Sequence, residues 1–337
     1  MIEYTLKLTI IFFIWSNTLY AQNIDLLHVQ SEGYYLLPSE IGAHNKKWEV
    51  NSFLNSKTLL KDLPLRTYAL TGDYQVKRGL KRVYIGGSIG STKLLNTPYA
   101  ENEFHASFAY HQVIQNQSIS IGIQPGILIR NLDTDWLIFP DQYDRTTGGF
   151  NSNSPTNELI ELNNNSWVFN MNVGIAYGFK LQNSNLRVLL AGRNLNNPSM
   201  SFSNTDYKID REYLEQIKMD YYLSTNQMLK SYLLLKQGGK RSVYNLGSEI
   251  YHQIKKSSFI VSQISAGSSI IIQSANYPNV VVFNLGIGFY KSKLGFAYAY
   301  NFAGNKLANS FNTFEIMLSF FAWHSQLDFY SVPCEIY

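Results

Sequence analysis

The residue types that could do acid–base chemistry gather on one short segment. Glu103, His105, Ser107 and His111 occupy odd positions, so an extended strand would place them on one face. Together they supply an acid, a base and a nucleophile. Side chains two residues apart on a strand lie roughly 6–7 Å apart, too far for direct hydrogen bonds without partners from other strands. The pattern therefore favours a polar wall, facing the lumen of a larger structure, over a catalytic centre.

Metal and cofactor chemistry find little support. His105 and His111 would need further ligands, and no spaced cluster of His, Cys or Asp supplies them. Asp141 and Asp144 could favour calcium, but their spacing does not match an EF-hand loop. No G-x-S-x-G, P-loop or dinucleotide motif occurs. We therefore predict a protein that is not an enzyme, with no catalytic residues, no metal site and no cofactor.

The elements that would position these side chains are strongly alternating strands. In the longest stretch, Trp167 to Leu181, large apolar residues hold the odd positions, and Asn, Gly, Ala and Lys hold the even ones from Asn170 to Lys180. Successive side chains of a strand point to opposite faces, so one side is apolar and the other small or polar. A tilted strand needs about 10 residues to cross a bilayer, whereas strands of globular proteins are usually nearer 5–6. This pattern is typical of a transmembrane β-barrel.

The same alternation recurs along the chain and predicts an all-β, up-and-down antiparallel barrel of about 14 strands, an even number as expected for bacterial barrels. The predicted strands lie at Trp48–Leu54, Tyr68–Val76, Val83–Ile89, Glu103–His111, Ser118–Ile129, Trp167–Leu181, Leu186–Arg193, Ile217–Thr225, Met228–Lys236, Tyr244–Ile250, Phe259–Ile272, Val281–Phe289, Leu294–Phe302 and Phe314–Phe320.

The links between these strands supply a second indication. Those after even-numbered strands are tight, as at Lys77–Gly79 and Gln115–Gln117. The others are generally longer, the largest being Asp133–Asn165, Leu195–Gln216 and Ala303–Ser310. Outer-membrane barrels have short periplasmic turns and longer extracellular loops. The links therefore predict a barrel with short turns at its periplasmic end and longer loops at its extracellular end.

The N-terminal residues predict export. Lys7 provides a positive start, Leu8–Trp15 a short apolar stretch and Ala21 a small residue for cleavage, so residues 1–21 read as a signal peptide. The apolar stretch is too short for a spanning helix. We therefore expect the mature protein in the outer membrane, in contact with its lipid.

The remaining chain divides around the barrel. Residues 22–47 lack clear periodicity and could either plug the lumen or hang in the periplasm. The barrel is expected over 48–321, followed by a periplasmic tail at 322–337. The tail carries Cys334, the one cysteine, so no disulfide framework is possible.

Composition agrees with this assignment. No later run of 18 apolar residues exists, which excludes a helical membrane protein. The 24 Tyr and 20 Phe suit the aromatic girdles of a barrel. The net charge of +4 is small for this length and no basic block occurs, so no nucleic-acid partner is expected.

A series of short segments, spread in sequence order over most of the mature chain, resembles segments of a known protein family. The most specific of them is the FPDQYD sequence of Phe139–Asp144. The others are Leu63–Thr67, Thr71–Tyr74, Ile85–Ile89, His105–His111, Ile121–Arg130, Ser154–Glu158, Gly192–Pro198 and Phe314–Phe320. Together they resemble the PorP/SprF family of Bacteroidota outer-membrane proteins, which serve type IX secretion and gliding motility.

The resemblance implies a non-enzymatic barrel that assists the export or surface anchoring of a partner. The implied partners are type IX secretion components and a secreted surface protein with a C-terminal sorting domain, such as a large adhesin. Loops on a rigid barrel are where recognition would sit. The predicted docking loop consists of Phe139, Pro140, Asp141, Gln142, Tyr143, Asp144 and Arg145.

Two other functions stay open at this point. A barrel of this size encloses a lumen, so a channel for small solutes is the main alternative. An outer-membrane hydrolase that uses His105 and Ser107 is the third.

Overall fold

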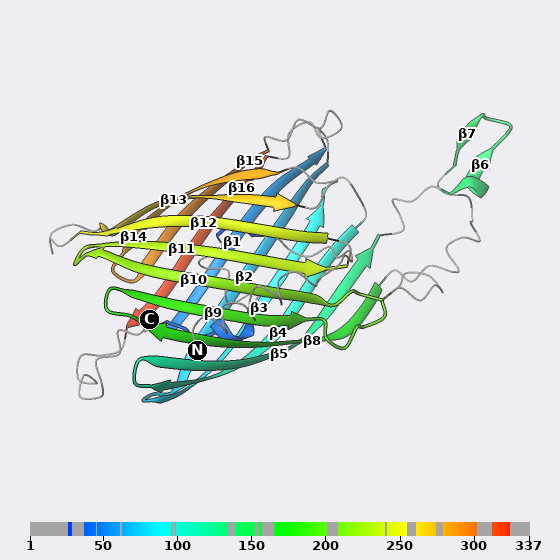
Figure 1. The fold of residues 1–337 in the computed structure, drawn as a ribbon. Helices are drawn as coiled ribbons and strands as arrows, with labels where there is room; N and C mark the ends of the chain where they lie inside the picture. The colour runs from blue at the N-terminus through cyan, green and yellow to red at the C-terminus, as the bar shows by residue number, and fades with distance from the viewer. Residues whose placement is uncertain are drawn as a thin grey trace.

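The chain forms a closed β-barrel in a computed structural model (Figure 1). The structure describes residues 26–28, 37–44, 46–60, 63–95, 97, 99–133, 139–151, 154, 156, 165–200, 208–239, 241–254, 261–273, 279–301 and 312–323. The predicted signal peptide, most of the predicted tail and Cys334 lie outside these ranges.

The described residues form fourteen barrel strands, each antiparallel to its neighbours, as predicted. They are β1 (Lys46–Leu60), β2 (Leu63–Lys77), β3 (Lys81–Leu94), β4 (Tyr99–Ile114), β5 (Gln117–Leu132), β8 (Asn165–Lys180), β9 (Ser184–Arg193), β10 (Glu212–Ser224), β11 (Gln227–Gly238), β12 (Arg241–Gln253), β13 (Val261–Gln273), β14 (Val280–Phe289), β15 (Ser292–Asn301) and β16 (Thr313–Trp323).

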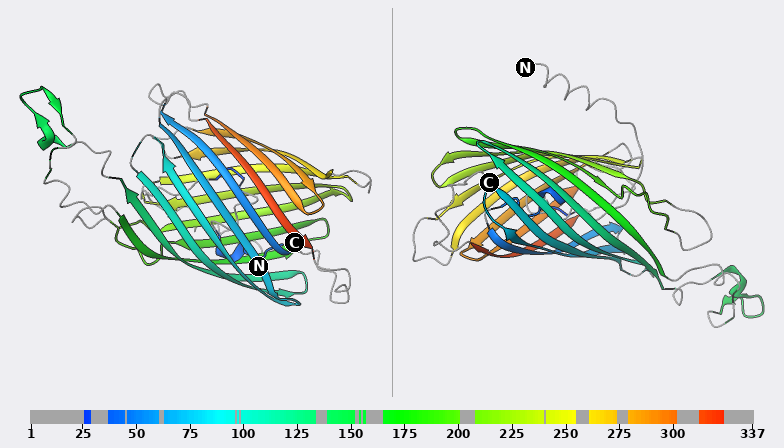
Figure 2. Two further views of the ribbon diagram at one scale, coloured as in Figure 1. Left: turned by 180° about the vertical axis from the view of Figure 1, so that it is seen from behind. Right: turned by 90° about the horizontal axis from the view of Figure 1, so that it is seen from below.

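Side-chain alternation sets which face of each strand points inward. Along β5, Ser118, Ser120 and Gln124 are buried inside the barrel, while Ile119 and Ile121 are exposed on its outer surface. This is the reverse of a soluble protein, because the polar face is buried and the apolar face is open. It is the arrangement that a lipid environment requires. Figure 2 shows the wall from two further directions.

The barrel closes where the first strand meets the last. β1 pairs with β16 over the stretch from Trp48 opposite Ala322 to Lys57 opposite Thr313. Closure gives every barrel strand two hydrogen-bonded neighbours, so the described barrel has no edge strand. Among the described residues, no helix is long and apolar enough to span a membrane.

Strand bounds differ from the predicted ones mainly by being longer. β1 has 15 residues and begins at Lys46, and β10 begins at Glu212, five positions before the predicted Ile217. The extra residues of β10 include two inward polar side chains, Glu212 and Gln216. Both fit the strand alternation, but their residue types are also common in loops. On the side with the long links, two intervals between strands are short, because β1 ends at Leu60 and β2 begins at Leu63, and β11 ends at Gly238 and β12 begins at Arg241.

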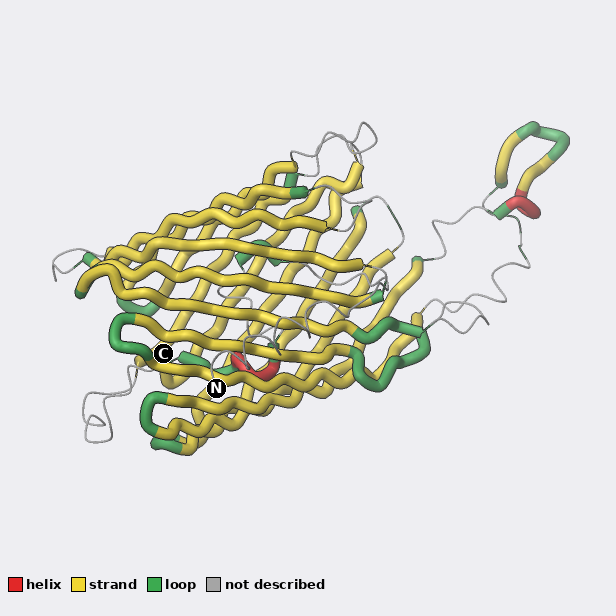
Figure 3. Tube along the Cα trace, in the orientation of Figure 1, coloured by secondary structure: helices red, strands yellow, loops and turns green. Residues whose placement is uncertain are grey.

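Four short elements of the described residues lie outside the wall strands. The 3-10 turn η1 (Pro38–Glu40) packs inside the barrel against β4, β5, β8 and β9. The long link between β5 and β8 carries the 3-10 turn η3 (Pro140–Gln142) and a small hairpin of β6 (Tyr143–Asp144) and β7 (Gly149–Phe150). Figure 3 shows the two turns in red, η1 within the yellow barrel and η3 at the base of the hairpin, which lies beyond the ends of β5 and β8. We call the end with the long links the outer end.

Candidate functional site

The four inward residues of β4 lie buried on the inner face of the wall. Their exposed fractions are 3% for Glu103, 6% for His105, 7% for Ser107 and 1% for His111. Strand geometry keeps them in one column, and neighbouring strands supply their partners. The contacts decide whether they can act as an acid, a base and a nucleophile.

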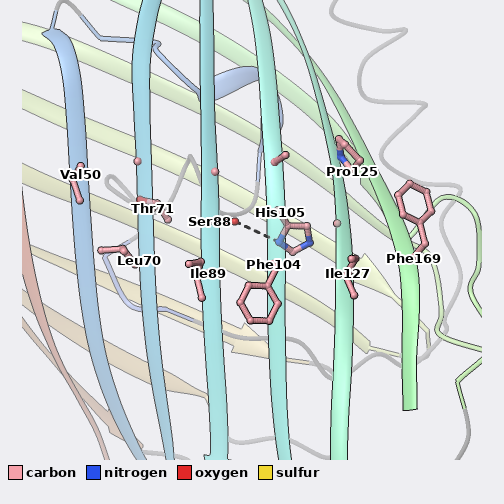
Figure 4. Close-up of a pocket in the computed structure, with 14 residues that line it drawn as sticks. Val50, Leu70, Thr71, Ser88, Ile89, Phe104, His105, Pro125, Ile127 and Phe169 are labelled. Carbon is pink, nitrogen blue, oxygen red and sulfur yellow. Dashed lines mark hydrogen bonds between the residues drawn. The ribbon is translucent and has the colours of Figure 1, made fainter. Parts of the chain in front are cut away.

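His105 and Ser107 contact neutral side chains of nearby strands. The ring of His105 lies 3.4 Å from Ser88 Oγ and 3.2 Å from the amide nitrogen of Asn170, the first contact being drawn in Figure 4. Ser107 Oγ accepts a hydrogen bond of 3.1 Å from Gln124. The serine is thus engaged by an amide instead of a histidine base.

His111 forms the closest serine–histidine contact. Its Nε2 lies 2.6 Å from the carbonyl oxygen of Ile41 and its Nδ1 lies 2.6 Å from Ser120 Oγ. Because a carbonyl can only accept, Nε2 carries the proton and Nδ1 accepts from the Ser120 hydroxyl. Ser120 is fully buried. This pair is a structural link between wall and interior, closed to a substrate.

A buried ion-pair cluster crosses the barrel near its outer end. Arg193, at the end of β9, lies 3.2 Å from Glu212 of β10 and 3.6 Å from Glu103 of β4. Lys236 of β11 lies 3.2 Å from Glu212. Arg193 and Glu212 are each only 1% exposed, so the charges compensate one another away from water.

The turn after β9 protects an otherwise open strand edge. β8 pairs with β9 only from Val173 onward, so residues 165–172 have no β9 partner. Asn196 fills part of this gap: its side chain donates to Phe169 O at 2.7 Å and accepts from Met171 N at 3.2 Å. Asn194 adopts φ 51°, a left-handed conformation that asparagine tolerates well.

Replacing Asn196 with alanine should therefore lower the free energy of unfolding by about 0.5–1.5 kcal/mol, because two exposed hydrogen bonds to the β8 backbone are lost. Equilibrium unfolding of the refolded protein in detergent micelles measures this. Asn116→Ala, at the exposed turn between β4 and β5, is the matched control and should change little. Equal stability of the two variants would contradict this role for Asn196.

The predicted docking loop folds into a small ordered unit. Gln142 is buried at its centre, where its side chain accepts from Phe139 N at 2.9 Å and donates to Ser154 O at 2.8 Å. The rings of Tyr143 and Phe150 pack edge to face with centroids 5.2 Å apart. Pro140 begins the η3 turn, and Arg145 is exposed at the hairpin tip. A recognition surface here would be preformed.

The two aspartates of this loop are engaged by threonine hydroxyls. Thr156 donates to Asp141 at 2.8 Å, and Thr146 donates to Asp144 at 2.6 Å. These hydrogen bonds from Thr146 hold the pKa of Asp144 below its usual value. The described residues contain no group of three or more His, Cys, Asp or Glu side chains that could hold a metal ion.

A shallow groove of about 600 Å³ lies over β1 to β5 and β8. Its sides are the outward residues Leu70, Ile89, Phe104, Ile127 and Phe169, several of which Figure 4 labels. Its floor is made of the small residues Gly72, Gly87 and Ala106 together with Pro125. The sides are hydrocarbon, which suits contact with lipid acyl chains.

A closed cylinder with a polar, packed interior and an apolar outer surface is an outer-membrane β-barrel. Within this class the sequence is specific: the model of the family described as type IX secretion system membrane protein PorP/SprF matches residues 29–320. The chain belongs to this family, as the resemblance predicted. No curated protein sequence matches it.

Solved structures share the fold at very low sequence identity. The Pseudomonas putida toluene transporter TodX is 8% identical, with 91% of this chain and 95% of that one covered and a TM-score of 0.53. The Ralstonia pickettii toluene transporter TbuX is 6% identical, with 87% and 93% covered and a TM-score of 0.54. The CymD monoaromatic hydrocarbon channel is 10% identical, with 88% and 94% covered and a TM-score of 0.52.

Several interior residues escaped the sequence analysis. Glu40, Arg187, Lys218 and Glu315 all carry buried ion pairs or hydrogen bonds, yet none received a role. For the three strand residues, Arg187, Lys218 and Glu315, the signal was a charged residue at an inward position, as Glu315 is between Phe314 and Ile316. Parity alone could not say which charges meet, because the partners come from distant strands.

Proposed function

We propose that this protein is a non-enzymatic outer-membrane barrel that assists type IX secretion by docking a secreted partner at the cell surface. The partner would be a protein with a C-terminal sorting domain, such as a large adhesin of gliding motility. The family match over residues 29–320 carries this proposal. Components of the secretion machinery would contact the opposite, periplasmic end.

The docking loop gives the proposal a physical basis. Phe139–Arg145 lies on the longest described link and is ordered by its own hydrogen bonds around Gln142. A preordered loop loses little conformational entropy on binding, which favours affinity. Its exposed Tyr143 and Arg145 are residue types enriched at the centres of protein interfaces.

The packed interior argues against the open solute channel. Inward side chains such as Gln124, Leu189 and Val282 are fully buried. A water-filled pore would leave such groups exposed. The fold shared with TodX and TbuX therefore does not by itself favour transport of a solute.

Replacing Phe139–Arg145 with a flexible Gly-Ser linker of equal length tests the docking role. Surface display of the secreted partner should fall about tenfold or more, since loss of a few central contacts is worth that much affinity. Mass spectrometry of proteins released by protease from intact cells measures display, and immunoblotting of outer membranes checks barrel abundance.

The matched control replaces Thr225–Asn226, the tight turn between β10 and β11 at the opposite end, with Gly-Ser. This variant should display the partner normally. Normal display by the Phe139–Arg145 variant, at normal barrel abundance, would refute the docking loop.

A further inference from the structure

The described N-terminal residues lie inside the barrel. Leu26–His28 and Leu37–Gly42 are almost completely buried, although they belong to no wall strand. Among the described residues, the hydrogen bonds that join backbone to backbone in 37–44 stay within the segment, from Glu40 N to Leu37 O and from Ala43 N to Glu40 O. The segment is therefore held to the wall by side chains, without strand pairing.

Residues Leu26–His28 are anchored by one buried carboxylate. Glu315 of β16 is 0% exposed and accepts from the backbone N–H groups of Leu27 at 2.8 Å and His28 at 2.9 Å. The ring nitrogen Nδ1 of His28 lies 2.6 Å from the same group. Asn55 of β1 donates to it at 2.8 Å. Glu315 lies near the outer end of β16, so Leu26–His28 reach deep into the barrel.

The second part of the segment, residues 37–44, is anchored by Glu40. Its carboxylate lies 2.6 Å from Arg187 Nε on β9 and 2.6 Å from Lys218 Nζ on β10. Arg187 also donates to the carbonyl oxygen of Ser39 at 3.2 Å. Burial alone would raise the pKa of Glu40, but these two cations lower it to about 2, so the carboxylate is ionised.

The wall is shaped to receive this segment. Gly122 of β5 and Gly174 of β8 are paired in register and face the η1 turn. A Cβ atom on Gly122 would lie 2.1 Å from Pro38 O, and one on Gly174 would lie 3.2 Å from Ser39 Oγ. Any side chain at Gly122 would collide with backbone, so the two glycines form a notch for Pro38–Ser39.

From these contacts we propose that residues 26–28 and 37–44 form a detachable plug that closes the lumen, with Glu40 as its latch and the glycine notch as its seat. Polar side-chain contacts can be exchanged without breaking the barrel ladder, whereas a paired strand could not be withdrawn so simply. The plug keeps the barrel impermeable while it is seated. This inference is independent of the docking loop and of the secreted partner.

Single-channel recording in planar lipid bilayers tests the plug in the full-length mature protein. The wild type should be silent. Glu40→Gln removes the charge but keeps the shape, and the time spent conducting should rise about tenfold or more, the effect of losing a charge-assisted contact. Gly122→Val fills the seat and should open the lumen persistently. Gly149→Val, in the outer hairpin where nothing lies within 4 Å, is the matched control and should stay silent.

A reversible crosslink tests that the plug itself causes closure. In a Glu40→Gln background with Cys334→Ser, the pair Ser39→Cys and Gly174→Cys lies within disulfide reach. Oxidation should close these channels and a reductant should reopen them. The heat-induced mobility shift on gels confirms that each variant is folded.

Two results would overturn the proposal. One is a wild-type protein that conducts continuously as an open pore. The other is silence of both Glu40→Gln and Gly122→Val when each is folded.

Discussion

Replacing Arg193 with methionine should lower the free energy of unfolding by about 3–5 kcal/mol, the largest stability loss that we expect from a single substitution. The loss is large because the substitution leaves two buried carboxylates without the cation that compensates them. Glu103 and Glu212 are 3% and 1% exposed, and removal of the guanidinium leaves their negative charges buried with less compensation. Urea unfolding in detergent micelles, followed by tryptophan fluorescence, measures the change.

Two further variants separate the charge effect from loss of packing. Arg145→Met removes an exposed arginine at the hairpin tip and should leave stability nearly unchanged. Adding Glu103→Gln to Arg193→Met should recover part of the loss, because one uncompensated charge is gone. If Arg193→Met and Arg145→Met were equally stable, the cluster would have no energetic role.

Arginine in place of Ile123 should destabilise the barrel in lipid vesicles by about 2–4 kcal/mol, because it places a charge near the middle of the hydrocarbon. Ile123 is an outward residue near the centre of β5, with 40% of its surface exposed. Reversible unfolding by guanidinium chloride from vesicles gives the free energy.

The control uses the same strand and face at another depth. Ile119 lies close to the turn with β4, so Ile119→Arg should cost only about 0–1 kcal/mol. A flat profile, with equal losses at the two positions, would mean that this face of β5 does not contact the membrane core.

The barrel strands could be predicted from the sequence because side-chain alternation is a local property of each strand. Alternation along Trp167–Leu181 reflects the two faces of a single strand, and the same rule applied to each segment predicted the fourteen barrel strands of the described residues. The start of β10 was placed too late because Glu212 and Gln216 look like loop residues until Arg193 and the neighbouring strands give them a polar interior.

The interior contacts could not be predicted, because they join residues far apart in sequence. His111 meets the carbonyl of Ile41, and Glu40 meets Arg187 and Lys218, only after the barrel has closed around the segment. For residues 22–47 the absence of periodicity left two locations open. Asn196 had no visible role either, since its partners are backbone atoms of β8 left over by an incomplete pairing.

That incomplete pairing gives the barrel a stepped rim. β5 and β8 pair along their whole length, up to Asn131 opposite Asn165, whereas β9 stops at Arg193, well short of that point. The part of β8 that pairs with β5 but has no β9 partner, residues 165–172, extends roughly 25 Å at the usual rise per residue. The hairpin of β6 and β7 is tethered to this tallest part of the wall. If this hairpin docks the proposed secreted partner, the partner would be held beside the mouth of the cylinder and off its axis.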